Sequence, residues 1–115
     1  MKLDEKLTQI GLKMKNLVVV DLSFPEMKFP AFKSAYEQRY VHLLHRKTSA
    51  VKIAGGIASQ GKIVLVFGVD NGEVNLSDST LNVKVVKRDK SAHWDNLERD
   101  LKEFGASVLL IPSED

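Results

Sequence analysis

The chain has 115 residues, of which 43% are hydrophobic and 28% charged, and its formal net charge is +2. This balance excludes global disorder, and the length fits a single domain over residues 1–115 with one hydrophobic core. The small charge excess does not indicate a nucleic-acid partner, and we expect none. Because the chain contains no cysteine, disulfides, thiolate metal sites and cysteine nucleophiles are excluded.

Nothing in the hydropathy pattern predicts a membrane segment. No apolar run approaches the ~20 residues that a bilayer-spanning helix needs. The stretch from Met1 to Asn16 is charged and amphipathic, and it lacks the apolar core of a signal peptide. We therefore expect no membrane association and a cytoplasmic location.

Helical and extended patterns alternate from the start of the chain. A helical spacing of apolar residues opens it, at Leu3, Leu7, Ile10 and Met14. The β-branched run Leu17–Val20 follows without polar alternation, as expected for a strand covered on both faces. The next helix is predicted over Ala31–Arg39 and the next strand over Tyr40–Leu44. In that helix the residues expected to face the core are Phe32, Ala35 and Tyr36.

A longer helix is predicted over Thr48–Gln60. Its apolar stripe consists of Val51, Ala54 and Ile57. Gly55 and Gly56 lie in mid-helix, where each glycine costs about 1 kcal/mol relative to alanine. Such a cost is tolerated where another backbone approaches closely, so we expect close packing here. The clearest buried strand of the chain, Ile63–Phe67, comes next.

The last part of the chain completes the alternation. Residues 68–81 are polar and turn-rich and carry no helix signal. A strand is then predicted over Asn82–Val86, a helix over Trp94–Phe104 with Gly105 as its cap, and a strand over Val108–Ile111. This order predicts a three-layer α/β fold with about five mostly parallel strands, of the flavodoxin-like kind.

Three stretches carry a resemblance to a known family when they are taken in order. They are residues 17–23, residues 40–63 with the segment Ala54-Gly55-Gly56-Ile57-Ala58, and residues 81–112. Together they resemble the pyrimidine-binding domain of transketolase and deoxyxylulose phosphate synthase. The resemblance covers most of the chain and implies the fold of that transketolase pyrimidine domain. It also implies a site for thiamine diphosphate between chains.

The chain departs from this family where the cofactor chemistry is carried. A family glutamate hydrogen-bonds the aminopyrimidine ring, and its place falls on Lys47. A lysine at neutral pH has no acceptor, so it cannot exchange a proton with the ring as a carboxylate does. Phe67 alone remains near the place of the family's stacking phenylalanines, and the diphosphate-binding domain has no counterpart. We expect no catalytic residues, and no cofactor unless a partner supplies the missing parts and with them thiamine diphosphate.

The candidate ligand-binding residues are Asp21, Ser23, Lys47, Phe67 and His93. Asp21 and Ser23 follow the first strand, where open α/β sheets place ligands, and an ordinary polar turn is the alternative. Lys47 is either an anion contact at a helix start or an exposed lysine. His93 either matches a family histidine near the substrate channel or is a surface or capping residue.

No metal site is predicted. His42 and His45 lie three residues apart at the end of a strand, which points their side chains to opposite faces. A shared metal ion is therefore not expected.

The resulting functional prediction is a stand-alone, non-catalytic transketolase-like domain that acts as an oligomerising or interaction module. The resemblance implies a homodimer through the Thr48–Gln60 helix, because the equivalent family helix lies near the subunit interface. Tight packing of this helix on its own sheet is the competing explanation for its glycines. Two alternatives remain: one subunit of a split thiamine-diphosphate-dependent enzyme with a transketolase-like partner chain, and a sensor that binds a small ligand.

Overall fold

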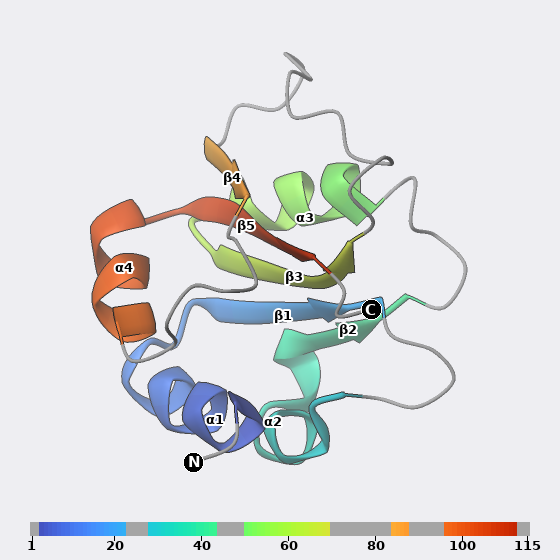
Figure 1. Cartoon of the computed structure of the whole chain (residues 1–115), viewed down its shortest axis with the longest axis vertical. Coiled ribbons are helices and arrows are strands. Elements are labelled where there is room, and N and C mark those ends of the chain that lie inside the picture. The colour runs from blue at the N-terminus through green and yellow to red at the C-terminus, as the bar shows by residue number, and fades with distance from the viewer. Residues whose placement is uncertain (1–2, 23–27, 44–49, 70–83, 88–95, 113–115) are drawn as a thin grey trace.

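The computed structural model describes residues 3–22, 28–43, 50–69, 84–87 and 96–112. Within these residues five parallel strands form one sheet in the order β2-β1-β3-β5-β4 (Figure 1). The strands are β1 (Leu17–Asp21), β2 (Tyr40–His42), β3 (Ile63–Val69), β4 (Lys84–Lys87) and β5 (Ser107–Pro112). The helices of the same residues are α1 (Leu3–Lys13), α2 (Pro30–Ala35), α3 (Ala50–Ala58) and α4 (Leu97–Phe104), with the 3₁₀ turn η1 (Glu37–Arg39).

The sheet separates two apolar clusters, and this confirms the predicted three-layer α/β fold. Successive side chains of a strand point to opposite faces, so alternate residues of the three central strands enter different clusters. One cluster lies between the sheet and α1, α2 and α4, with Leu17, Val19, Ile63, Leu65 and Leu109 from the strands. The other lies under α3, with Val18, Val20, Val64, Val66, Val108 and Leu110 from the strands. The unbroken apolar runs are therefore buried on both faces.

The crossovers through α2, α3 and α4 follow one rule of handedness. The connections through α2 and through α4 both move toward the β2 edge, and both helices lie on the same face of the sheet. The connection through α3 moves in the opposite direction and lies on the opposite face. Direction and face change together, as right-handed crossovers require. The flavodoxin-like order 2-1-3-4-5 is shared as far as β3, after which β5 lies between β3 and β4.

One predicted core residue is wrong. Phe32 is buried and Tyr36 packs against the core, but Ala35 is exposed. The reason is that α2 ends at Ala35 and the chain tightens into η1, so the helical spacing no longer applies at this position. At the other end of the chain Gly105 has φ 65° and its N–H donates to Leu101, which confirms the predicted cap of α4.

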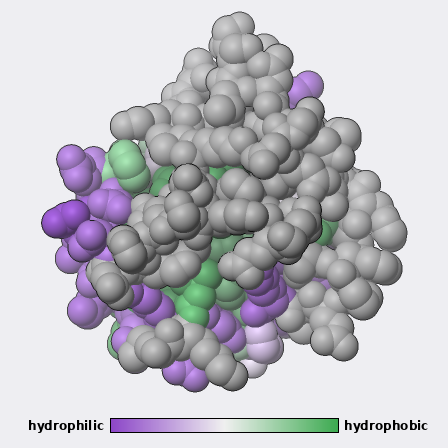
Figure 2. All heavy atoms as spheres, in the orientation of Figure 1, coloured by the Kyte–Doolittle hydropathy of each residue, from purple (hydrophilic) through white to green (hydrophobic). Residues whose placement is uncertain are grey.

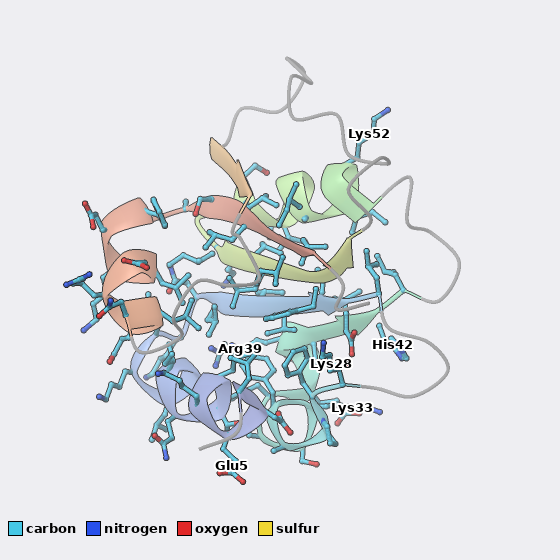
Figure 3. All side chains as sticks on the ribbon, in the orientation of Figure 1. Glu5, Lys28, Lys33, Arg39, His42 and Lys52 are labelled. Atoms are coloured by element: carbon cyan, nitrogen blue, oxygen red, sulfur yellow. The ribbon has the colours of Figure 1, made fainter. Side chains whose placement is uncertain are left out.

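Arg39 joins the end of α1 to the start of β1. Its guanidinium donates to the carbonyls of Gly11 (3.1 Å), Met14 (2.8 Å) and Leu17 (2.8 Å). The same group lies 4.3 Å from the ring centroid of Tyr36. Desolvation lowers the pKa of Arg39, but an arginine remains protonated in proteins. Figure 3 shows this side chain pointing inward between α1 and the sheet.

Asp4 of α1 caps the start of α2, although the two are far apart in the sequence. Its two carboxylate oxygens accept the N–H groups of Ala31 (2.9 Å) and Phe32 (3.0 Å). Phe29, at the N-cap position, makes no side-chain cap, and Pro30 has no N–H. Asp4 therefore supplies from α1 the cap that α2 lacks in its own sequence.

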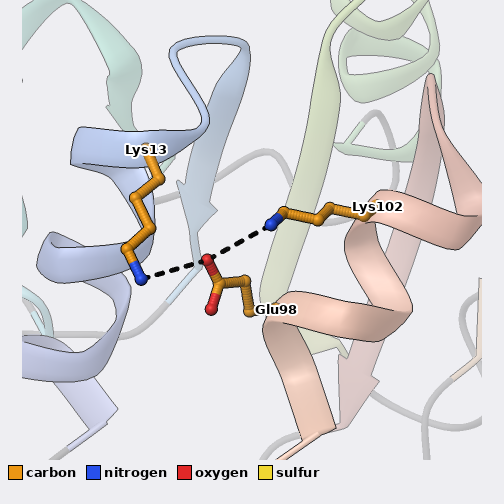
Figure 4. A network of polar contacts seen from close by, with 3 residues as sticks. All are labelled: Lys13, Glu98 and Lys102. Carbon is orange, nitrogen blue, oxygen red and sulfur yellow. Dashed lines mark ion pairs between the residues drawn. The ribbon is translucent and has the colours of Figure 1, made fainter.

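Charged side chains cover the outer surface of α1 and α4 (Figure 2). Glu98 of α4 binds Lys13 of α1 (3.5 Å) and Lys102 of its own helix (3.7 Å), as Figure 4 shows. These are exposed pairs, each worth about 0–1 kcal/mol, so the apolar contacts decide how α1 packs on α4. Among the helices of the described residues, none has the length and apolar character that crossing a bilayer requires.

Gly11 is the position on α1 where a side chain cannot be accommodated. A Cβ atom there would lie 2.8 Å from Cε2 of Tyr36 and 3.2 Å from both Phe32 and Arg39. We expect Gly11→Ala to lower the free energy of unfolding by about 1–3 kcal/mol, because these packed rings must shift. Urea denaturation followed by circular dichroism measures this change.

Gly56→Ala is the matched control for this substitution. A Cβ atom at Gly56 meets no described atom within 4 Å. In dilute solution this variant should gain about 0.5–1 kcal/mol from helix propensity. Equal stability of the two variants would show that the contacts around Gly11 carry no energy.

Candidate functional site

The candidate site lies where β1 and β3 end side by side. From β1 the chain turns toward the β2 edge, and from β3 it continues toward the other edge, so the strand order reverses between them. Open α/β sheets place ligands at the carboxyl ends of strands at such a point. Asp21 ends β1 and is paired in register with Phe67 of β3 and with His42 of β2. The backbone contacts continue one residue further, from Leu22 N–H to the Phe67 carbonyl (3.0 Å).

The carboxylate of Asp21 is engaged by the chain itself. Its side chain is buried, and Oδ2 accepts hydrogen bonds from the Tyr40 hydroxyl and from the backbone N–H of Lys28 (2.8 Å). Tyr40 comes from β2, and Lys28 precedes α2. Asp21 therefore fastens two elements to the end of β1, and this is a structural use of a residue placed where ligands commonly bind.

Phe67 is also occupied from within. Its ring is 2% exposed and lies 4.4 Å, centroid to centroid, from the ring of Phe29. Beyond it β3 is irregular, because its register against β5 shifts at Gly68, which has φ 88°. A ligand ring could stack on Phe67 only after Phe29 had moved. Asp21 and Phe67 in this arrangement therefore do not fit an aminopyrimidine ring.

Tyr40 has a strongly perturbed phenol group. Burial raises the pKa of its phenol well above the usual value, and the hydrogen bond to Asp21 and the negative charge of that carboxylate raise the pKa further. The phenol therefore stays protonated and remains a donor to Asp21.

The structure places only some of the predicted site residues. Asp21 and Phe67 lie next to each other, as their strand positions predict. Ser23, Lys47 and His93 lie outside the described residues. Sequence reasoning missed Tyr40 and Phe29, which contact Asp21 and Phe67. A buried tyrosine usually bonds its hydroxyl to a partner, so a tyrosine at the start of a strand next to β1 was the available signal.

The predicted separation of His42 and His45 stays a prediction, since His45 lies outside the described residues. Figure 3 shows His42 at the end of β2. In the part of the chain that the structure describes, no three histidine, aspartate or glutamate side chains are grouped so as to hold a metal ion. The described residues of this edge provide a buried carboxylate, a neutral phenol and two packed aromatic rings.

The raised pKa of Tyr40 predicts a loss of stability in alkali. In the unfolded chain a tyrosine ionises near about pH 10, whereas in the folded protein Tyr40 keeps its proton. The stabilisation that Tyr40 contributes is complete below about pH 10. Above that pH the free energy of unfolding decreases by about 1.4 kcal/mol per pH unit. Urea denaturation at several pH values between about pH 9 and about pH 11 measures the slope.

Tyr40→Phe is the control for this slope, because lysines also titrate in that range. The slope of the wild-type protein should exceed that of the variant. Identical pH dependence of the two proteins contradicts the assignment.

No model of a known protein family, no curated protein and no solved structure matches the chain. Functional conclusions therefore depend on the residues and on the geometry of this edge and of the helices. The likeness to the transketolase family remains a resemblance carried by the three stretches of sequence.

Proposed function

We propose that the chain is a non-catalytic, transketolase-like domain that acts as an interaction module, with a second copy of itself as its partner. The contact runs through the exposed side of α3. The observation that carries this proposal is the environment of Gly56. A chain without cysteine fits a reducing compartment, and we propose the cytoplasm as its location.

The two glycines of α3 differ in their surroundings. Gly55 is buried, as are Ala54 and Ala58 on the side of the helix that packs on the sheet. Internal packing therefore accounts for the small size of Gly55. Gly56 is exposed, and a Cβ atom there would meet no described atom within 4 Å.

Backbone conformation does not require a glycine at position 56 either. The described glycines with positive φ are Gly61, Gly68 and Gly105. Gly56 thus costs the helix about 1 kcal/mol relative to alanine and gains no packing within the described residues. A surface that another backbone approaches closely would offset this cost.

The chemistry around Gly56 suits a close helix contact. Ile53 and Ile57 flank it and are half-buried in the single chain. Lys52 is the one charged residue of α3, and Figure 3 shows it projecting away from the body of the protein. A two-fold pairing of two α3 helices would cover the isoleucines and leave the lysines at the rim.

The resemblance supports the same surface, because the equivalent helix of the transketolase family lies near its subunit interface. The geometry of the β1–β3 edge supports the non-catalytic part of the proposal. Asp21 and Phe67 are bound by Tyr40 and Phe29, so a cofactor would first have to displace them. Neither the sensor nor the split enzyme gains support from these contacts.

Gly56→Leu tests the dimer. Sedimentation equilibrium of the wild-type chain at tens of micromolar should give a dimer, and the variant a monomer. Leucine is a better helix former than glycine, so the variant should unfold at no lower urea concentration than a wild-type monomer. Loss of the dimer then cannot be attributed to loss of the fold.

Ala35→Leu is the matched control, since Ala35 is exposed on α2 on the opposite face of the sheet. This variant should remain a dimer. A monomeric wild-type chain, or a Gly56→Leu variant that dimerises equally well, contradicts the proposed contact.

Thiamine diphosphate with Mg²⁺ tests the non-catalytic assignment. A ligand present at about 100 times its dissociation constant stabilises a protein by about 2.7 kcal/mol, which gives a clear rise in melting temperature. We expect no rise with the cofactor at millimolar concentration. A rise that Phe67→Ala abolishes would instead favour a ligand-binding site or the split enzyme.

A further inference from the structure

The segment that enters α2 is fastened by acidic side chains from other elements. The N–H of Lys28 donates to Asp21 at the end of β1, and the N–H groups of Ala31 and Phe32 donate to Asp4 of α1. Helix α2 has six residues, too few to be stable without tertiary contacts. The two carboxylates therefore hold this segment together with the core contacts of Phe29 and Phe32.

Asp21 is the more critical of the two acceptors. It is completely buried, whereas Asp4 is half-buried. One oxygen of Asp21 accepts both the Lys28 N–H and the Tyr40 hydroxyl. Hydrogen bonds to an ionised acceptor are about twice as strong as neutral ones. Protonation would weaken both bonds and leave the buried Tyr40 hydroxyl poorly satisfied.

We propose that Asp21 is an acid-sensitive latch: its carboxylate holds the segment Lys28–Phe29 and β2 on the end of β1, and neutralising it frees that segment before the sheet unfolds. Phe29 lies in the freed segment and covers Phe67. Release of the latch would therefore uncover an aromatic ring at the carboxyl edge of the sheet. This goes beyond the proposed interaction through α3, which lies on the other face of the sheet.

Among the described residues, other titratable and charged groups face this position from β2, from the segment itself and from α1. Tyr40 and His42 come from β2, Lys28 from the segment itself, and Asp4 acts on Tyr40 from α1. The pKa of Tyr40 is raised, so its phenol keeps its proton throughout the acid range. Asp4 binds different N–H groups from those that Asp21 binds. The N–H of Lys28 is therefore a specific reporter of Asp21.

Nuclear magnetic resonance on the full chain tests the latch. The ¹³Cγ shift of Asp21 and the amide proton shift of Lys28 are followed from about pH 7 to about pH 3. We expect one common midpoint. Across it the protection of the Lys28 amide from hydrogen exchange should fall at least about tenfold, while the amide of Leu65 in β3 keeps its protection.

Three variants complete the experiment. Asp21→Asn should reproduce the loss of Lys28 protection at neutral pH. Asp4→Asn and His42→Gln should leave the response of the Lys28 amide to pH unchanged.

The proposal is overturned if the Lys28 amide does not follow Asp21, or if Leu65 loses protection at the same pH, which would mean cooperative unfolding. It is also overturned if folded Asp21→Asn keeps Lys28 protected at neutral pH, or if His42→Gln abolishes the response. Should Asp21→Asn fail to fold, the titration of the wild-type chain decides.

Discussion

The guanidinium of Arg39 sets the geometry of the half of the molecule that contains β1 and β2. It satisfies three carbonyl groups, two at the end of α1 and one at the first residue of β1. The elements around it are short: β2 and η1 have three residues each and α2 has six. Phe32 of α2 and Tyr40 of β2 enter the core, but elements this short have few backbone hydrogen bonds of their own. Asp4, Arg39 and Asp21 add polar contacts that help to position them.

The carboxyl ends of β1 and β3, where a ligand would be expected, are occupied by contacts within the chain. Asp21 and Phe67 occupy the position that favours binding in open α/β sheets, yet both serve to hold α2 and β2 in place. A ligand that took Asp21 from its partners would leave the buried Tyr40 hydroxyl unsatisfied, at a cost of about 1–3 kcal/mol. The contacts of Asp21 and Phe67 are made to partners within the chain and hold its elements together.

The sequence predicted the elements that depend on local pattern. The buried strands Val18–Val20 and Val64–Val66 are recognisable because they are apolar on both faces, and α4 because Gly105 ends it. Local pattern carries no information about contacts between distant residues. Asp4 reaches α2 across 27 residues of sequence, and Asp21 reaches Tyr40 across 19. The place of β5 between β3 and β4 is likewise set by the path of the chain in space, which no window of sequence records.

The glycines of α1 and α3 differ in whether packing within the chain accounts for their small size. In sequence Gly11, Gly55 and Gly56 look alike, since each lies within a predicted helix. In the structure, aromatic rings and a guanidinium crowd Gly11, and Gly55 is buried. Gly56 alone of the three is exposed, with open space around the position of a Cβ atom. Replacing it should therefore stabilise the single chain, and a dimer that is lost on replacement would indicate that this position lies in a contact with another molecule.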